Sequence, residues 1–291
     1  MSFHSVRRPV LAAGGLLFAV VVAAGAVLVR AQAEPLPSAP AAARRWIDSA
    51  LEDLARGRTE AAAGKLRLAR WTAPADPEAT ILLAWVHAAR EEWQEARSLL
   101  GAVDVESLPP SWRAAALGVV GMAHQALGEA ARAAQAYGQL LESDPTAALA
   151  HEGLGKLAMD AASDSRTAAE LRSSWPAGAG AAAPDSPDAW RKLAEDELRA
   201  ALKQAPDRMQ LYVSLARSLM DSQRWEEAGA VLKEALRVNY RVPALHYLLG
   251  ELYERQGNEA AAIGAYRRAL EIDPTYRPAS ERLERLRRAA P

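Results

Sequence analysis

The sequence predicts an all-α fold, a solenoid built from stacked helix pairs, on the basis of three observations. Alanine accounts for 67 of the 291 residues and aromatic residues for only 6%, a composition that favours helices packed closely through small side chains. A pattern of apolar and small residues recurs every thirty-four residues from position 43 onward, as in proteins made of stacked repeats. No segment shows the strict alternation of apolar and polar residues that a half-buried strand needs.

Residues 1–30 are predicted to be a membrane anchor or a signal peptide. Residues 9–29 carry no charge, and as a helix they would be about 31 Å long, which matches the hydrocarbon core of a bilayer. Arg7 and Arg8 precede this stretch, so the positive-inside rule places the rest of the chain outside the cytoplasm. The sequence therefore predicts a single-pass protein of a bacterial inner membrane with a periplasmic or otherwise extracytoplasmic body.

Two interpretations of this segment compete, because Ala31-Gln32-Ala33 has the small-x-small pattern of a signal-peptidase site and cleavage after Ala33 would release a secreted protein. The apolar run is longer than the roughly 7–15 residues of a typical signal peptide, which favours an uncleaved anchor. A third interpretation, a buried core helix, is disfavoured because the run has no polar face. Residues 31–42, rich in proline and alanine, are predicted to be a short stiff linker.

The thirty-four-residue pattern is clearest in 243–276. Its marker residues are His246, Leu249, Gly250, Tyr253, Gly257, Ala262, Tyr266, Ala269 and Pro274. At these spacings the unit resembles a tetratricopeptide repeat, which consists of two helices joined by a turn. The resemblance implies an array of about six such pairs, whose first helices line a concave groove that binds other proteins.

The remaining units follow the same register with two interruptions. The other continuous units are 43–76, 77–110, 114–147 and 209–242. One further unit is split into 148–160 and about 188–205, and residues 161–187 between them, rich in alanine, serine, glycine and proline, are predicted to be a flexible insertion. Whether the insertion orders when a partner binds is left open. Residues 277–291 are predicted to be a polar-backed capping helix, so that the repeat domain spans 43–291.

Catalytic, metal and cofactor sites are not predicted. The near balance of 35 basic and 36 acidic residues gives no field that would attract nucleic acid, and the absence of cysteine removes thiolate chemistry. His87 and His124 fall where the repeat has its tyrosine, and His151 and His246 fall where it has its leading aromatic residue, so we expect these histidines to replace packed rings. No phosphate-binding loop, nucleophile elbow or paired histidine motif is present. The sequence therefore predicts a protein that is not an enzyme.

The candidate binding residues are the inward-facing positions of the first helices. The first units offer apolar side chains and the later ones charges of mixed sign. The predicted groove residues are Ile47, Leu51, Leu54, Ile81, Trp85, Met122, Lys156, Arg217, Glu251 and Arg255. The lysine and asparagine clamp that some tetratricopeptide repeats use to hold a partner's C-terminus is not in place, and an apolar groove continued by charges suits an amphipathic helix or an extended peptide. The alternative is that the apolar half packs internally or against 31–42.

These features predict a membrane-tethered scaffold or adaptor that binds a partner protein or peptide outside the cytoplasm. The alternative is a structural or assembly-factor subunit of a larger membrane complex, as in cytochrome c maturation or secretion systems. The partner, the pathway and the oligomeric state are not determined by the sequence.

Overall fold

A computed structural model describes residues 40–179 and 182–289. The predicted anchor or signal peptide, and all but the last three residues of the predicted linker, lie outside these ranges. None of the helices found within them combines the length and the apolar character that crossing a lipid bilayer requires.

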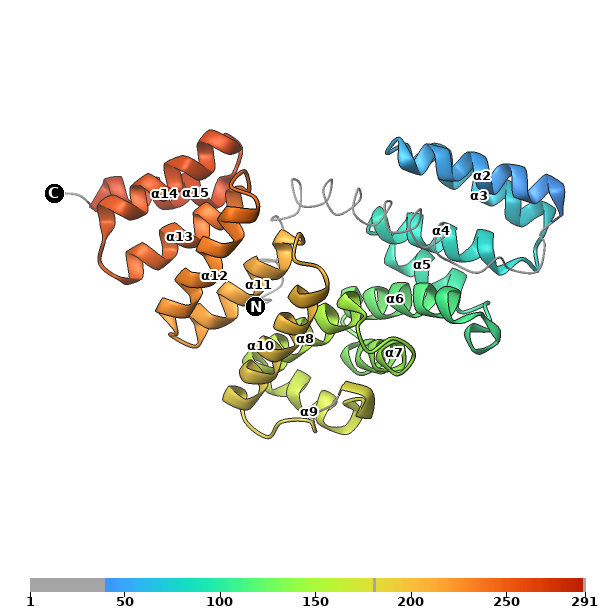
Figure 1. Ribbon diagram of the computed structural model, residues 1–291, viewed down its shortest axis with the longest axis horizontal. Coiled ribbons are helices and arrows are strands. Elements are labelled where there is room, and N and C mark those ends of the chain that lie inside the picture. Colours follow the sequence, from blue (N-terminus) through green and yellow to red (C-terminus); the bar gives the residue numbers. More distant parts are fainter. Residues whose placement is uncertain (1–39, 180–181, 290–291) are drawn as a thin grey trace, which may run out of the picture. The chain divides into compact units, whose positions relative to one another are not determined.

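In the described ranges the regular structure is entirely helical (Figure 1). The α-helices are α2 (Ala41–Ala55), α3 (Thr59–Thr72), α4 (Pro77–Ala89), α5 (Trp93–Leu100), α6 (Pro110–Ala126), α7 (Ala130–Ser143), α8 (Ala148–Ser163), α9 (Ser165–Ser174), α10 (Pro187–Gln204), α11 (Met209–Asp221), α12 (Trp225–Val238), α13 (Pro243–Arg255), α14 (Glu259–Ile272) and α15 (Arg277–Ala289). Two short 3₁₀ turns, η1 (Val105–Ser107) and η2 (Ala177–Ala179), complete the list. The prediction of an all-helical fold is confirmed for these residues.

The helices form two compact units, each a stack of helix pairs. Unit 1 comprises the described residues up to Pro145 together with Ser174–Ala179. In it α2 packs on α3, α4 on α5 and α6 on α7. Unit 2 comprises Thr146–Ser173 and the described residues from 182 onward. There α8 packs on α10, α11 on α12 and α13 on α14, and α15 packs on α14 at the end. These are the six pairs and the final helix that the repeat pattern predicts.

Small residues allow the two helices of a pair to approach each other closely. A Cβ added to Gly121 of α6 would lie 2.7 Å from Cδ1 of Tyr137, and one added to Gly250 of α13 would lie 2.6 Å from Cδ1 of Tyr266. Real side chains essentially never come so close, so each tyrosine ring occupies the space that the glycine leaves. The rings of Tyr137 and Tyr266 are buried, and this explains the pairing of glycine and tyrosine in the repeat.

The turn inside five of the pairs uses one residue in the left-handed region. Gly57, Gly128 and Gly257 hold φ angles of 71°, 76° and 73° in three turns. Glu91 and Gln223 hold φ angles of 61° and 58° in two others. A side chain in this region costs about 1–2 kcal/mol relative to ordinary backbone, a cost that glycine avoids. The turns at Glu91 and Gln223 are therefore strained.

Residues 161–187, predicted to be a flexible insertion without regular structure, contain α9, which corrects that part of the prediction. The carboxylate of Asp164 accepts hydrogen bonds from the backbone N–H of Arg166 and Thr167 at 3.2 and 3.1 Å and so caps the helix. Leu171 and Ala168 on α9 are buried. The prediction relied on the overall composition of 161–187, which is dominated by small residues, and so overlooked the capping aspartate and the two apolar residues.

The chain after α9 returns to unit 1. The 3₁₀ turn η2 packs on α7, and a Cβ added to Gly138 of α7 would lie 2.7 Å from Cγ of Pro176. The insertion is thus held in a notch that only glycine can provide. On the other side, Arg172 donates to the carbonyl oxygens of Pro184 and Asp185 at 3.2 and 2.9 Å.

Buried carboxylates link helices within each unit. Asp53 of α2 pairs with Lys65 of α3 at 2.6 Å and with Arg58 in the turn. The hydrogen bond from Lys65, aided by Arg58, holds the pKa of Asp53 below its usual range. Glu152 of α8 pairs with Arg208, just before α11, at 2.7 Å. A buried carboxylate needs such partners, because an unpaired charge in the interior is strongly destabilising.

Candidate partner-binding groove

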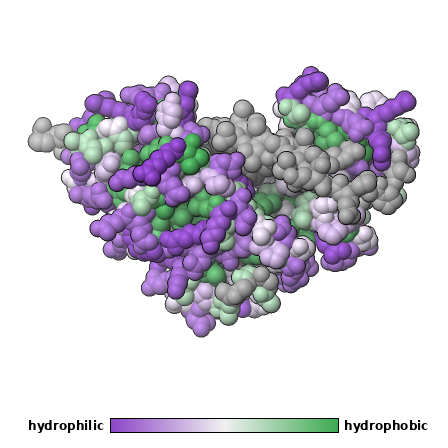
Figure 2. All heavy atoms as spheres, in the orientation of Figure 1, coloured by the Kyte–Doolittle hydropathy of each residue, from purple (hydrophilic) through white to green (hydrophobic). Residues whose placement is uncertain are grey.

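A pocket of about 500 Å³ lies within unit 2. It is lined by residues of α11, α12, α13 and α15, namely Arg217, Met220, Asp221, Trp225, Leu248, Glu251, Glu254, Arg255 and Arg282. Six of these nine carry a charge, and Met220, Trp225 and Leu248 supply the apolar part. Figure 2 shows the same mixture on the visible face of these helices, where apolar residues lie between hydrophilic ones.

Most of the residues that line the pocket occupy equivalent positions of two successive repeats. Arg217, Met220 and Asp221 of α11 stand thirty-four residues before Glu251, Glu254 and Arg255 of α13. Equivalent positions of two successive first helices therefore face the same space. The exchange of residue types between the two helices gives the pocket both signs of charge.

One part of the pocket is held by internal contacts. Arg282 of α15 pairs with Glu251 at 2.9 Å and lies 3.8 Å from a carboxylate oxygen of Glu254. Tyr247 donates to Glu251 at 2.8 Å, and the hydroxyl of Tyr266 donates to Glu254. Glu251 thus accepts hydrogen bonds from α13 and α15, whereas Glu254 accepts one from α14 and forms an ion pair with α15.

The electrostatics follow from these contacts. Burial disfavours the charge on Arg282, but the Tyr247 hydroxyl and the carboxylates of Glu254 and Glu251 outweigh it, so the pKa of Arg282 lies above its ordinary value. Burial, followed by the hydrogen bond to Glu254, raises the pKa of Tyr266. Both groups keep their protons at physiological pH, which leaves Glu251 and Glu254 as acceptors.

The other charged residues of the pocket have no such partners. Arg217 and Arg255 are exposed, and neither they nor Asp221 form an ion pair with another of the described residues. A ligand that pairs with these groups therefore breaks no ion pair between described residues. The arrangement can therefore bind a chain segment that brings an apolar side chain and charges of both signs.

Family models agree with the repeat pattern on both units. A tetratricopeptide repeat model matches residues 191–234 and 213–277, and a second such model matches residues 120–147. The chain contains tetratricopeptide repeats. These repeats indicate a scaffold for protein–protein interaction.

Solved structures share the fold of these repeats. A chain of the APC/C hetero-tetramer Cut9-Hcn1 is 16% identical, with a TM-score of 0.65 over 94% of this chain. This chain covers 46% of that one, so it spans less than half of its length. PilF of Pseudomonas aeruginosa is 17% identical, with a TM-score of 0.52 over 82% of this chain and 96% of PilF. At these identities the similarity shows the fold alone. A search of curated proteins gives no match.

The structure brings three of the predicted groove residues together and places the others elsewhere. Arg217, Glu251 and Arg255 share the pocket. Lys156 of α8 is partly buried and pairs with Glu152 at 2.6 Å, and Met122 of α6 is partly buried in unit 1. The pocket does not include Lys156 or Met122.

The apolar half of the predicted groove is largely packed. Ile47, Leu54, Ile81 and Trp85 are buried, with exposed fractions of 1%, 3%, 0% and 7%, and Leu51 is partly exposed. Side chains at such burial belong to the interior of a repeat array and present little surface to a ligand. Partner binding by these residues stays a prediction, and their low exposure does not support it.

Four histidines of the described ranges make polar contacts, three of them within a single repeat. His87 and His124, near the ends of α4 and α6, each place Nδ1 at 2.5 Å from the glutamate five residues later, Glu92 and Glu129. His151 places Nδ1 at 2.6 Å from Glu197, and Nε2 of His246 lies 2.7 Å from the carbonyl oxygen of Tyr240. Of these four histidines only His87 is buried, and the other three are partly buried. The expectation that all four take the place of packed core rings therefore fits His87 alone.

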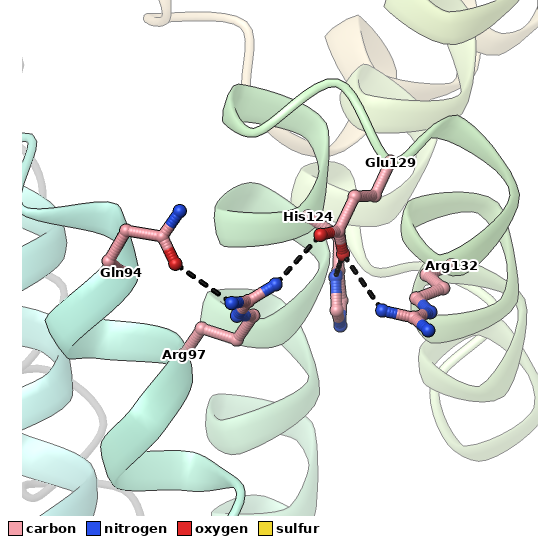
Figure 3. A network of polar contacts seen from close by, with 5 residues as sticks. All are labelled: Gln94, Arg97, His124, Glu129 and Arg132. Carbon is pink, nitrogen blue, oxygen red and sulfur yellow. Dashed lines mark hydrogen bonds and ion pairs between the residues drawn. The ribbon is translucent and has the colours of Figure 1, made fainter.

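Glu129 extends its histidine contact to the neighbouring repeat (Figure 3). Its carboxylate accepts from Arg97 of α5 at 2.7 Å and from Arg132 of α7 at 3.3 Å. The hydrogen bond with His124, together with Arg97 and Arg132, holds the pKa of Glu129 below its usual range. In the described part of the chain, no group of three or more histidine, aspartate or glutamate side chains is arranged to hold a metal ion.

Sequence reasoning missed the contribution of α15 to the pocket. The sequence predicts a capping helix with a solvated polar back over 277–291, yet the side chain of Arg282 in this helix is only 29% exposed and pairs with α13. Arg282 stands thirty-four residues after Leu248, which also lines the pocket. Extending the repeat register into the final helix is the signal that identifies it.

Proposed function

We propose that this protein is a non-enzymatic scaffold that binds a segment of a partner protein in the unit 2 pocket. One observation carries the proposal: successive first helices place Arg217, Asp221 and Arg255 around one space, and none of the three forms an ion pair with another residue of 40–179 or 182–289. A charged group that has no internal partner is available to a ligand at low cost, whereas a paired one must first be released.

The lining defines the chemistry of the segment. An apolar side chain would lie against Met220 and Trp225, which are partly exposed, and this contact would supply most of the affinity. A carboxylate of the partner would face Arg217 and Arg255, and a basic or donor group would face Asp221. Charges of both signs fix the direction of the bound segment more than they add affinity.

The experiment is affinity capture with the full chain in detergent, followed by mass spectrometry and measurement of the dissociation constant. The double variant Arg217→Glu, Arg255→Glu is expected to weaken binding by about tenfold or more, which corresponds to about 1.4 kcal/mol. Arg267→Glu is the matched control, since Arg267 is exposed on α14 and outside the pocket. Equal affinity of the double variant and the control, at unchanged helical content, would remove the pocket from the proposal.

The proposal includes a tether to a bacterial inner membrane with the repeats on the periplasmic side. The uncharged stretch 9–29 after Arg7 and Arg8 supports it. The mass of the N-terminal peptide from isolated membranes tests it, because an anchor retains residues before Ala33 and a cleaved signal peptide does not. Protease added to spheroplasts should digest the repeats of a tethered protein; protection of the repeats would place them in the cytoplasm.

A further inference from the structure

The first helix pair exposes an unusual amount of apolar surface. Trp71 is 80% exposed, Leu68 43% and Trp46 38%, and all three lie on α2 and α3. The stack has its polar-backed helix α15 at the other end of the sequence, where Arg285, Arg287 and Arg288 are exposed. A terminal pair that carries tryptophan on its surface needs an environment that takes up apolar side chains.

One contact between α2 and α3, together with the spacing of residues on a helix, indicates that these three residues lie near one another. Nζ of Lys65 donates to Oγ of Ser49 at 2.7 Å, which marks the level and the side on which the two helices meet. Leu68 follows Lys65 by three residues, and Trp46 precedes Ser49 by three. Because the two helices run in opposite directions, Leu68 and Trp46 both lie about one helical turn from this contact, toward the same end of the pair. Trp71 follows one more turn along α3. Trp46, Leu68 and Trp71 are called the tryptophan patch below.

The tryptophan patch lies at the end of the pair where the chain enters. The turn between α2 and α3 is at the opposite end, at residues 56–58. The predicted membrane segment ends at position 29, so eleven residues separate it from the start of α2. A chain of eleven residues reaches at most about 40 Å. A tethered protein therefore keeps this end of the first pair close to the bilayer surface.

The charges around the tryptophan patch suit an anionic surface. Residues 41–72 contain seven basic and four acidic residues. Arg44, Arg45 and Arg67 form no ion pair within the described ranges. Arg45 and Arg67 are exposed, and each basic residue near an anionic bilayer adds attraction that falls off within about a Debye length.

We propose that the tryptophan patch, with Arg44, Arg45 and Arg67, rests in the headgroup region of an anionic lipid bilayer. Tryptophan favours this region because its ring is apolar and its N–H is polar. A second copy of the chain fits less well, because a stable protein interface takes about 20–30 residues a side and the patch has three apolar ones. The proposal rests on the membrane tether of the proposed function.

The absence of cysteine allows a site-specific test. Gly64 is exposed on α3, one turn before Leu68, and a Cβ there meets no atom within 4 Å. Gly264 on α14 has the same properties in unit 2. The variants Gly64→Cys and Gly264→Cys therefore carry an environment-sensitive fluorophore at matched sites, in the full chain reconstituted into phosphatidylcholine vesicles with or without phosphatidylglycerol.

With phosphatidylglycerol, the label at position 64 is expected to shift to shorter wavelength and to be quenched by brominated lipids, and the label at position 264 to do neither. The shift should diminish at high salt and vanish when Trp46, Leu68 and Trp71 are all replaced by serine, exposed positions at which helical content should persist. Equal signals at 64 and 264, or a signal unaffected by the serine variant, would overturn the proposal.

Other occupants of the tryptophan patch give different results. A shift in detergent that grows with protein concentration would indicate a second copy, and one independent of concentration and lipid would indicate the chain's own apolar segment; either overturns the proposal. Flotation with pure phosphatidylcholine vesicles reports the tether separately. A chain that floats while position 64 stays unshifted retains its tether without the lipid contact, and a chain that does not float refutes both.

Discussion

Replacing Gly250 by alanine tests the packing that joins α13 to α14. The new Cβ would lie 2.6 and 2.8 Å from Cδ1 and Cζ of the buried Tyr266 ring, so the ring or the helix has to move. Overpacking of this kind costs about 1–3 kcal/mol, while alanine gains about 1 kcal/mol over glycine in helix propensity. We expect a net loss of up to about 2 kcal/mol. The Tyr266 hydroxyl should also separate from Glu254, a pocket residue.

Gly264→Ala is the matched control, because Gly264 lies in the same pair and a Cβ there meets no atom within 4 Å. It gains the same propensity without a clash, so the difference between the two variants isolates the clash at about 1–3 kcal/mol. Urea unfolding followed by circular dichroism gives this difference. Hydrogen exchange should show that the loss of protection is greatest in α13 and α14, since each pair in a stack contacts only its neighbours. Variants of equal stability would show that Tyr266 does not fill the space over Gly250.

Three further perturbations probe other parts of the fold. Gln223→Gly should raise the free energy of unfolding by about 1 kcal/mol in urea titrations, since glycine relieves a φ of 58°; a loss of stability would refute strain in this turn. The pKa of Asp53 is lowered in the folded state. Its carboxylate therefore stabilises the folded state at any pH above the pKa of about 3.9 that it has in the unfolded chain, and this contribution is lost as the pH falls through the pKa of the folded state. Asp53→Asn should therefore be less stable than the parent at neutral pH, with a gap that closes in acid; a gap independent of pH would contradict this. Gly138→Val should collide with Pro176 and speed hydrogen exchange at residues 174–179 while α7 stays protected; unchanged exchange would show that the notch does not hold the insertion.

The parts of the fold that depend on periodic spacing could be predicted from the sequence. The pairing of Gly250 with Tyr266 follows from two marker positions of the repeat, and the structure places the ring against the glycine. The same register grouped Arg217, Glu251 and Arg255, which share the pocket. Spacing predicts these features because a helix face is fixed by position alone.

Features that depend on partners distant in sequence could not be predicted in this way. The register assigns Ile81 and Trp85 to an inward face, but their burial depends on what packs against them. The docking of Pro176 on Gly138 joins residues on two sides of an interruption in the period. The pairing of Arg282 with Glu251 requires a geometry between α13 and α15 that composition does not encode.

The return of Ser174–Ala179 to unit 1 means that neither unit is a continuous stretch of polypeptide. A fragment ending at Pro145 would lack Pro176 and leave the notch at Gly138 empty, and a fragment beginning at Thr146 would carry a segment that belongs to the other unit. Dissection of this protein into halves should therefore follow the contacts and not the order of the residues, with the insertion supplied to the N-terminal half as a fused or added peptide.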